Sequence, residues 1–270
     1  MLSDAELSTF ETFTLALAAE AGRVALPLFR GEHGVMDKAG RAAGVYDPVT
    51  LADRGAEEAI RRLISVNHPR HGVIGEEFGS DRPDAEFVWV LDPIDGTAAF
   101  VAGLPLWTHL IALRHEGEPI VGVIAQSYLG EAFVGSRLGA RLVRDGESRA
   151  IRVRSCPLLT HAVIATTDPD LFNGAELGAW TQVRAAARYA RLGCDAYAYA
   201  MVAAGQLDLA VDSGLKSWDV EAAVPLIEGA GGLVTDWRGN RIGRNGGQFA
   251  AAGDRRCLDE ALVALRRSAA

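Results

Sequence analysis

Two carboxylates, Asp92 and Asp95, lie three positions apart at the end of an apolar run, and Gly96 and Thr97 follow them. The run itself, residues 87–91, is typical of a buried strand, because aromatic and β-branched side chains continue unbroken up to a turn signal. Acids at the end of such a strand lie at the rim of a sheet, where α/β proteins bind ligands. Neighbouring carboxylates repel each other unless a cation lies between them, and oxygen ligands favour a hard cation such as Mg²⁺.

Three more acids are candidates for the same site. Glu76 follows a short apolar strand; alone it reads as a solvated strand end, but an adjacent strand would bring it close to Asp92. Asp53 forms a capping-box pattern with Thr50, which leaves a structural and a functional role equally open. Asp219 begins a predicted helix, where an acid stabilises the helix by roughly 0.3–1 kcal/mol. Its local sequence alone therefore indicates a helix cap.

Composition sets the class of protein. The chain has 270 residues, 49% of them hydrophobic, which is enough for one large domain or two lobes around a substantial core. Its net charge of −8 argues against a general nucleic-acid binder or a protein of anionic membranes. Three scattered cysteines without a CxxC motif, an acidic N-terminus and the lack of a long apolar stretch predict a cytoplasmic protein in a reducing compartment.

The hydrophobic pattern predicts a layered α/β protein with two lobes that divide near residue 150. The first lobe, residues 1–150, is expected to carry the metal and phosphate site, and the second, 151–270, to recognise the substrate and contribute Asp219. The expected helices cover residues 3–30, 50–67, 195–205, 217–230 and a last segment from about 254. The expected strands cover 72–76, 87–91, 161–166, 207–211 and 233–236, with an antiparallel meander over 106–153.

The acids occur within an ordered set of motifs that resembles the inositol monophosphatase-like family of Mg²⁺-dependent phosphomonoesterases. The matching segments, in chain order, are Val49–Asp53, Gly75–Glu77, Asp92–Thr97 and Trp218–Asp219, leading to Glu228–Gly232. The resemblance covers nearly the whole chain. It implies a layered αβαβα sandwich of the inositol monophosphatase and sugar phosphatase type.

The resemblance also implies roles. Glu76, Asp92 and the Ile94 carbonyl would hold one Mg²⁺, and Asp92, Asp95 and Asp219 a second, with two or three ions per active site. Two metal ions can stabilise both the attacking and the leaving oxygen of an in-line displacement.

Other family roles concern water and phosphate. Asp53 and the Thr97 hydroxyl would orient the attacking, metal-activated water, and with Glu76 they form the expected catalytic set. The amides of Gly96 and Thr97 would bind the phosphate at a helix start. Lys38 has two open interpretations, a contact to the phosphate or to an additional Mg²⁺, or an ordinary solvated loop lysine.

The substrate is indicated by a separate segment, residues 191–199, which is similar to the histidinol-phosphate phosphatase branch of the family. Asp195 and Asp212 would suit a cationic alcohol through charge-assisted hydrogen bonds. Asp195 could instead cap the helix predicted over 195–205. Arg191 could contact substrate across a subunit boundary or pair with a surface acid. One departure from the branch is Ala98, where a basic residue is common.

The predicted function is therefore Mg²⁺-dependent hydrolysis of L-histidinol phosphate to L-histidinol and phosphate, a step of histidine biosynthesis. The expected partner is a small phosphate ester, with no nucleic acid and no membrane, and the resemblance implies a homodimer. The alternatives are an inositol-1-phosphatase or broad sugar-phosphate phosphatase and, from a different class, a non-catalytic scaffold that binds metal or phosphate.

Overall fold

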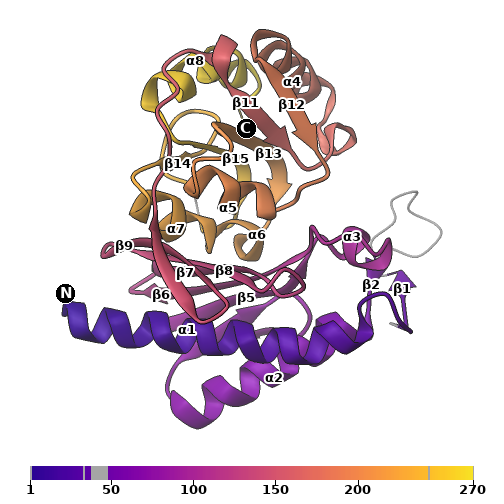
Figure 1. Ribbon diagram of the computed structural model, residues 1–270, viewed down its shortest axis with the longest axis vertical. Helices are drawn as coiled ribbons and strands as arrows, with labels where there is room; N and C mark the ends of the chain where they lie inside the picture. Colours follow the sequence, from indigo (N-terminus) through magenta and orange to yellow (C-terminus); the bar gives the residue numbers. More distant parts are fainter. Residues whose placement is uncertain (1, 33, 38–47, 243, 270) are drawn as a thin grey trace.

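The computed structural model describes residues 2–32, 34–37, 48–242 and 244–269. Its elements form alternating layers of helices and two sheets, with the larger sheet in the lower half of Figure 1 and the smaller sheet in the upper half. This arrangement confirms the layered α/β architecture predicted from the sequence. Within the described residues, no helix has the length and apolar character needed to cross a membrane.

The larger sheet is built from the first half of the chain and, within the described residues, has eight strands. In spatial order they are β10 (Glu147–Ile151), β9 (Gly139–Arg144), β8 (Glu131–Ser136), β7 (Glu118–Gln126), β6 (Thr108–His115), β5 (Phe87–Asp95), β3 (Gly72–Gly75) and β4 (Gly79–Asp81). Strands β5 to β10 pair antiparallel, as the predicted meander requires, whereas β3 and β5 are parallel.

Two long helices cover the outer face of this sheet (Figure 1). Helix α1 (Asp4–Ala25) begins at a capping box formed by Ser3 and Glu6, and α2 (Leu51–Asn67) begins at one formed by Thr50 and Asp53. In a capping box the two side chains satisfy two of the free amides at a helix start. Apolar side chains of both helices pack on the sheet around Trp89 and form the core on this side.

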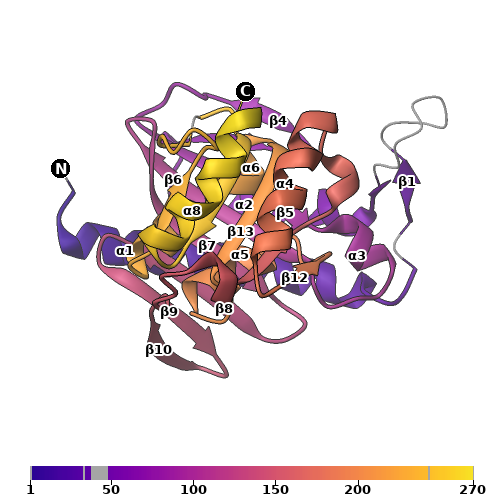
Figure 2. The ribbon, with the colours of Figure 1, turned by 90° about the horizontal axis from the view of Figure 1, so that it is seen from above.

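The smaller sheet is built from the second half of the chain. In spatial order its strands are β12 (Tyr189–Leu192), β11 (Val163–Thr166), β13 (Leu209–Leu215), β15 (Gly247–Ala252) and β14 (Leu233–Thr235). Helices α4 (Gly174–Ala186) and α8 (Arg255–Leu265) lie side by side over its outer face (Figure 2). Helix α8 starts at the Asp254 cap, close to the predicted position.

The layer between the sheets consists of three short helices, α5 (Tyr197–Ala203), α6 (Ser217–Val220) and α7 (Ala223–Gly229) (Figure 1). A large buried core joins them to both sheets. The remaining elements are short: β1 (Met36–Asp37), β2 (Pro48–Val49), α3 (Thr97–Val101) and the 3₁₀ turns Leu26–Leu28, Leu159–His161, Pro169–Leu171 and Arg266–Ser268.

Several predicted boundaries were wrong. The first helix ends at Ala25 and continues only as a 3₁₀ turn, and the strand from Phe87 runs on to Asp95. The helix predicted over 217–230 is two helices, α6 and α7. Pro225 explains the break, because it has no amide hydrogen to donate to the carbonyl four residues earlier and its ring clashes there.

Candidate active site

Strand pairing brings Glu76 to Asp92. Strand β3 runs parallel to β5 with Gly75 opposite Leu91, and the Glu76 amide donates to the Leu91 carbonyl at 3.2 Å. The residues that follow these partners, Glu76 and Asp92, therefore emerge at the same edge of the sheet. The juxtaposition predicted from the two adjacent strand ends is confirmed.

A bulge in β5 brings Asp95 to the same place. Asp92 lies opposite Leu110 of β6 and Asp95 lies opposite Thr108, so three steps along β5 match two along β6. In a regular strand, residues three apart point to opposite faces. The extra residue corrects this, and both acids face one pocket. Beneath the bulge, Nδ1 of the buried His109 donates to the Pro93 carbonyl at 2.5 Å.

The pocket has a volume of about 180 Å³ and combines residues from both halves of the chain. Its lining includes eight residues that the sequence singled out: Glu76, Asp92, Ile94, Asp95, Gly96, Thr97, Asp195 and Asp219. Three further lining residues, Thr167, Tyr199 and Leu215, were missed. Thr167 directly follows β11, which is the same strand-end signal that drew attention to Glu76, whereas Tyr199 and Leu215 reach the pocket only through tertiary packing.

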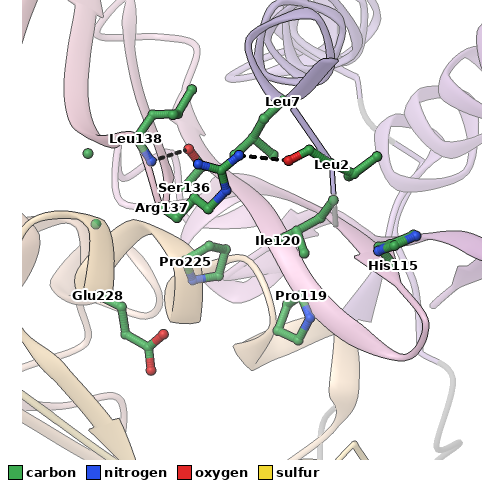
Figure 3. A pocket seen from close by; sticks show the side chains of 12 residues that line it. Leu2, Leu7, His115, Pro119, Ile120, Ser136, Arg137, Leu138, Pro225 and Glu228 are labelled. Carbon is green, nitrogen blue, oxygen red and sulfur yellow. Dashed lines mark hydrogen bonds between the residues drawn. The ribbon is translucent and has the colours of Figure 1, made fainter. Parts of the chain in front are cut away.

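A larger cavity of about 560 Å³ lies elsewhere, between the start of α1, the larger sheet and α7 (Figure 3). Apolar side chains such as Leu7, Ile120 and Pro225 line it, and Glu228 is its one carboxylate among the described residues. The acids that could do chemistry converge instead on the smaller pocket. We therefore take that acidic pocket as the candidate site.

The acids of the pocket destabilise one another as anions. Burial, followed by the charge of Glu76, raises the pKa of Asp92 well above its usual range. Burial, followed by the charge of Asp195, does the same to the pKa of Asp95. Burial also raises the pKa of Asp219 to about 7. A bound cation would remove this repulsion.

The side chains present fit a hard divalent cation. Among the described residues, Oδ1 of Asp92 is a buried oxygen without a hydrogen-bond partner. Asp95 and Asp219 each use one oxygen in a hydrogen bond with a backbone amide, that of Ala196 at 2.8 Å for Asp95 and that of Lys216 at 2.6 Å for Asp219. No three acids of the described chain already enclose a common ion position. The donor set consists of oxygens alone, which is the set that Mg²⁺ prefers.

Asp53 caps α2, as the structural interpretation predicts, and also contacts a residue of the pocket. Its Oδ2 accepts from the Thr50 amide at 2.8 Å and from the Thr50 hydroxyl, which caps α2. Its Oδ1 lies 3.1 Å from the Thr97 hydroxyl oxygen, and Thr97 lines the pocket. Burial raises the pKa of Asp53. Asp53 does not itself line the pocket, and its contact with the site is the hydrogen bond from Thr97.

Gly96 connects β5 to α3 at a position that a larger residue would not fit. Its φ is +76°, in the left-handed region that favours glycine. A Cβ atom there would lie only 3.0–3.3 Å from the side chain of Asp195. Glycine therefore allows the turn and leaves room for that carboxylate beside the start of α3.

Asp195 lines the pocket and does not cap a helix. Helix α5 starts two residues later, at Tyr197, and its cap residue Ala196 makes no side-chain hydrogen bond. The predicted helix start at 195 and the capping alternative were thus wrong. Asp195 itself has φ +44°, and burial together with the charges of Asp212 and Asp168 raises its pKa to about 6.

Asp212 was predicted to contact the substrate, but it lies behind the pocket wall. Its Oδ1 accepts from the Thr166 hydroxyl at 2.8 Å and the Thr167 amide at 2.7 Å, and its Oδ2 accepts from the Tyr199 hydroxyl at 2.8 Å. The side chain is buried and is not part of the pocket lining. The structure corrects its role to holding two lining residues in place.

One other predicted contact is not in the pocket, and one cannot be placed. Arg191 is an exposed residue of β12, opposite Ala165 of β11, and does not line the pocket. Lys38 lies outside the described residues, so both of its interpretations stay open.

Comparisons with known proteins identify the family. Residues 6–270 match the model of the inositol monophosphatase family. The bifunctional phosphatase IMPL2, chloroplastic, of Arabidopsis thaliana is 44% identical over 89% of this chain and 68% of its own length. A histidinol-phosphatase of Chlorobaculum parvum is 35% identical over 84% of this chain and 85% of its own length.

A solved structure agrees over almost the whole fold. The inositol monophosphatase of Zymomonas mobilis is 38% identical, covers 98% of this chain and 100% of its own, and superimposes with a TM-score of 0.84. The family match extends from the first helix to the end of the chain and includes every residue of the acidic pocket. This chain belongs to the inositol monophosphatase family of phosphatases.

Proposed function

We propose that this chain is a Mg²⁺-dependent phosphomonoesterase whose substrate is L-histidinol phosphate. The observation that carries the substrate assignment is the position of Asp195. Its carboxylate adjoins Gly96, and its charge adds to the burial that raises the pKa of Asp95, so the pocket holds one more acid than the set expected to bind metal. A substrate with a cationic alcohol group would be attracted to this acid, whereas a neutral polyol would gain no charge-assisted hydrogen bond.

The acids divide into two groups in this proposal. Glu76, Asp92, Asp95 and Asp219, with the Ile94 carbonyl, would hold the cations. When bound, Mg²⁺ would neutralise the phosphate and stabilise charge that develops on its oxygens. Asp195, beside Gly96, would bind the ammonium or imidazolium group of the alcohol. Gly96 and Thr97 would place their amides toward the phosphate at the start of α3.

Thr97 and Asp53 would handle the proton of the attacking water. The Thr97 hydroxyl has one hydrogen, and Asp53 Oδ1 at 3.1 Å and the Ile94 carbonyl at 3.0 Å are its acceptors. When the hydrogen points to Asp53, the Thr97 oxygen can accept a hydrogen bond from a water in the pocket. As the water oxygen attacks phosphorus, one of its protons passes through the Thr97 hydroxyl to Asp53 and the bond between phosphorus and the ester oxygen breaks. The leaving oxygen takes a proton from solvent, to which Asp53 later returns its own. The raised pKa of Asp53 makes it a better proton acceptor.

A second candidate substrate has support from the relatives. One of them is named a bifunctional phosphatase, and the Zymomonas mobilis structure is an inositol monophosphatase. Inositol phosphate hydrolysis would use the same acids and the same water. The two candidate substrates differ only in their alcohol, which would lie on the side of the pocket where Asp195 is.

The test is phosphate release from L-histidinol phosphate and from inositol 1-phosphate, for the unchanged protein and for Asp195→Asn. We expect the substitution to raise KM for histidinol phosphate by about 10- to 100-fold, the value of one charged hydrogen bond, with little change for a neutral ester. Asp170→Asn removes an acid from the exposed surface nearby and serves as the control. Faster turnover of the inositol ester by the unchanged protein would overturn the assignment.

A further inference from the structure

A buried ion pair connects the two halves of the molecule through the helix that carries Asp219. Arg114 of β6 and Glu221, which ends α6, have exposed fractions of only 7% and 4%. Nε of Arg114 donates to Oε2 of Glu221 at 2.5 Å, and Nη2 donates to Oε1. Both oxygens of the carboxylate are thus held by one guanidinium, the bidentate form that fixes geometry as well as charge.

The pair lies in the core between the two sheets. Leu110 and Ala112, which share the face of β6 with Arg114, belong to that core, whereas Ile111 and Leu113 face the outer helices. An ion pair in such a place loses the hydration of both charges, and a pair of apolar side chains would stabilise the fold as well or better. The ion pair is therefore expected to contribute little to the stability of the fold. Its contribution is to fix the position of α6 on the larger sheet.

That position affects Asp219. Asp219 and Glu221 are two residues apart, which is about 200° around a helix, so they point to opposite sides of α6. Asp219 lines the pocket and Glu221 meets Arg114. The Asp219 carboxylate is also fixed to its own helix, since it accepts from the Lys216 amide at 2.6 Å. Any shift of α6 across the larger sheet would displace Asp219 by a similar amount.

We infer that Arg114 and Glu221 are positioning residues that hold Asp219 at the correct distance from Glu76, Asp92 and Asp95. These three acids belong to the larger sheet and its edge, whereas Asp219 is the acid supplied by the middle layer of helices. A cation site made from both halves needs a fixed junction between them. The inference rests on the proposed binding of Mg²⁺ by these acids.

The test is the double variant Arg114→Met/Glu221→Gln, which leaves no unpaired charge in the core. Mg²⁺ affinity is measured by calorimetry on the purified protein without substrate. We expect the dissociation constant to rise about 10-fold or more, as for other residues that orient a metal ligand. At saturating Mg²⁺, KM for the phosphate ester should stay unchanged. Glu221→Gln alone should raise the constant as well and also lower the melting temperature, because it leaves Arg114 without its anionic partner.

A matched control is the double variant Arg154→Met/Asp208→Asn. Arg154 holds both oxygens of the buried Asp208 at 2.6 Å, but both residues belong to the second half of the chain. This variant should change the melting temperature and leave the Mg²⁺ constant unaltered. An unchanged Mg²⁺ constant in the Arg114/Glu221 variant, or an equal rise in the control, would overturn the inference. If Mg²⁺ binds and responds as expected but no phosphate ester is hydrolysed, the inference stands and the proposed function fails.

Discussion

The Thr97 hydroxyl oxygen lies 3.1 Å from Oδ1 of Asp53, although 44 positions of the chain separate the two residues. The other oxygen of the same carboxylate caps α2 through the amide and hydroxyl of Thr50. One carboxylate thereby ties the start of α2 to the start of α3. The two threonines that flank it can be changed separately, which allows the two roles to be measured apart.

We predict that Thr97→Val lowers kcat by about 10²- to 10³-fold, because the variant keeps the size of the side chain but cannot orient a water or pass a proton. Thr50→Val should lower the free energy of unfolding by about 1 kcal/mol through loss of the helix cap and retain most of the activity. Steady-state kinetics and urea denaturation of both variants check this. Equal losses of kcat in the two variants would contradict the division of roles.

Asp92→Asn should have opposite effects on stability and function. Oδ1 of Asp92 is buried and unpaired among the described residues, and the neighbouring acids repel its charge. Removing that charge should raise the free energy of unfolding of the metal-free protein by about 0.5–2 kcal/mol. The same change should abolish stimulation by Mg²⁺. Urea midpoints in EDTA and a Mg²⁺ titration of activity provide the test, and normal Mg²⁺ dependence would place the metal site elsewhere.

The pH dependence of stability should also report on these acids. Burial raises the pKa of Asp219 to about 7 and those of Asp195 and Asp212 to about 6 in the folded protein. In the unfolded chain such carboxyls titrate near 4, so the folded state binds more protons between these values and stability falls as the pH rises through 6 to 7. Lowering the pH of the metal-free protein from 8 to about 6.5 should therefore stabilise it.

The buried His109 and the half-buried His71 reduce this gain at lower pH. Burial lowers the pKa of His71 and His109 to about 4, whereas histidine in the unfolded chain titrates near 6.5. Between these values the unfolded state binds more protons, which opposes the effect of the acids. Because the acids with a raised pKa outnumber these two histidines, the stability of the metal-free protein should still rise below about pH 6.5, but less steeply than the acids alone would give. Saturating Mg²⁺ should flatten the slope above that pH, and an unchanged slope would show that the cation does not bind these acids.

Tyr199 and Tyr197 form a matched pair for the wall of the pocket. Both hydroxyls donate to a carboxylate at 2.8 Å, Tyr199 to the buried Asp212 and Tyr197 to Glu131. Tyr199→Phe should cost about 1–3 kcal/mol, because it leaves a buried oxygen without a donor, and should raise KM, because Tyr199 lines the pocket. Tyr197→Phe, which affects a half-buried bond, should cost less and leave KM unchanged. Thermal melts and KM values decide the comparison.

Sequence reasoning succeeded where the signal was local or the pattern periodic. The capping box at Thr50, the meander of strands and the pairing that brings Glu76 to Asp92 all follow from residue types and spacing over short distances. The residues that gather in the pocket could be selected in advance because acids at strand ends have few structural reasons to be there.

It failed where tertiary contacts decide. Nothing in the neighbourhood of Asp212 shows that Thr166, Thr167 and Tyr199 will occupy its oxygens, since these partners come from two other elements. Arg114 and Glu221 are 107 positions apart, and neither has a distinctive local sequence.

One wrong prediction had a local cause. The break before Pro225 was foreseeable, because proline in the first turn of a helix commonly marks its start.

The bulge between Asp92 and Asp95 has a consequence for how this segment can vary. Strand β6 pairs residue by residue with β5 from Phe87 to Asp92 and then, beyond the bulge, at Asp95. If the same residues paired regularly, without the bulge, Asp95 and all that follows it would turn toward the opposite face of the sheet. Deleting one residue would keep Asp95 on the face of Asp92 but would remove the bulge in which the Ile94 carbonyl accepts from the Thr97 hydroxyl. A replacement of Ile94 by another apolar residue would keep the geometry, whereas an insertion or deletion would not. In this segment the number of residues is a stricter requirement than the identity of the residue between the two acids.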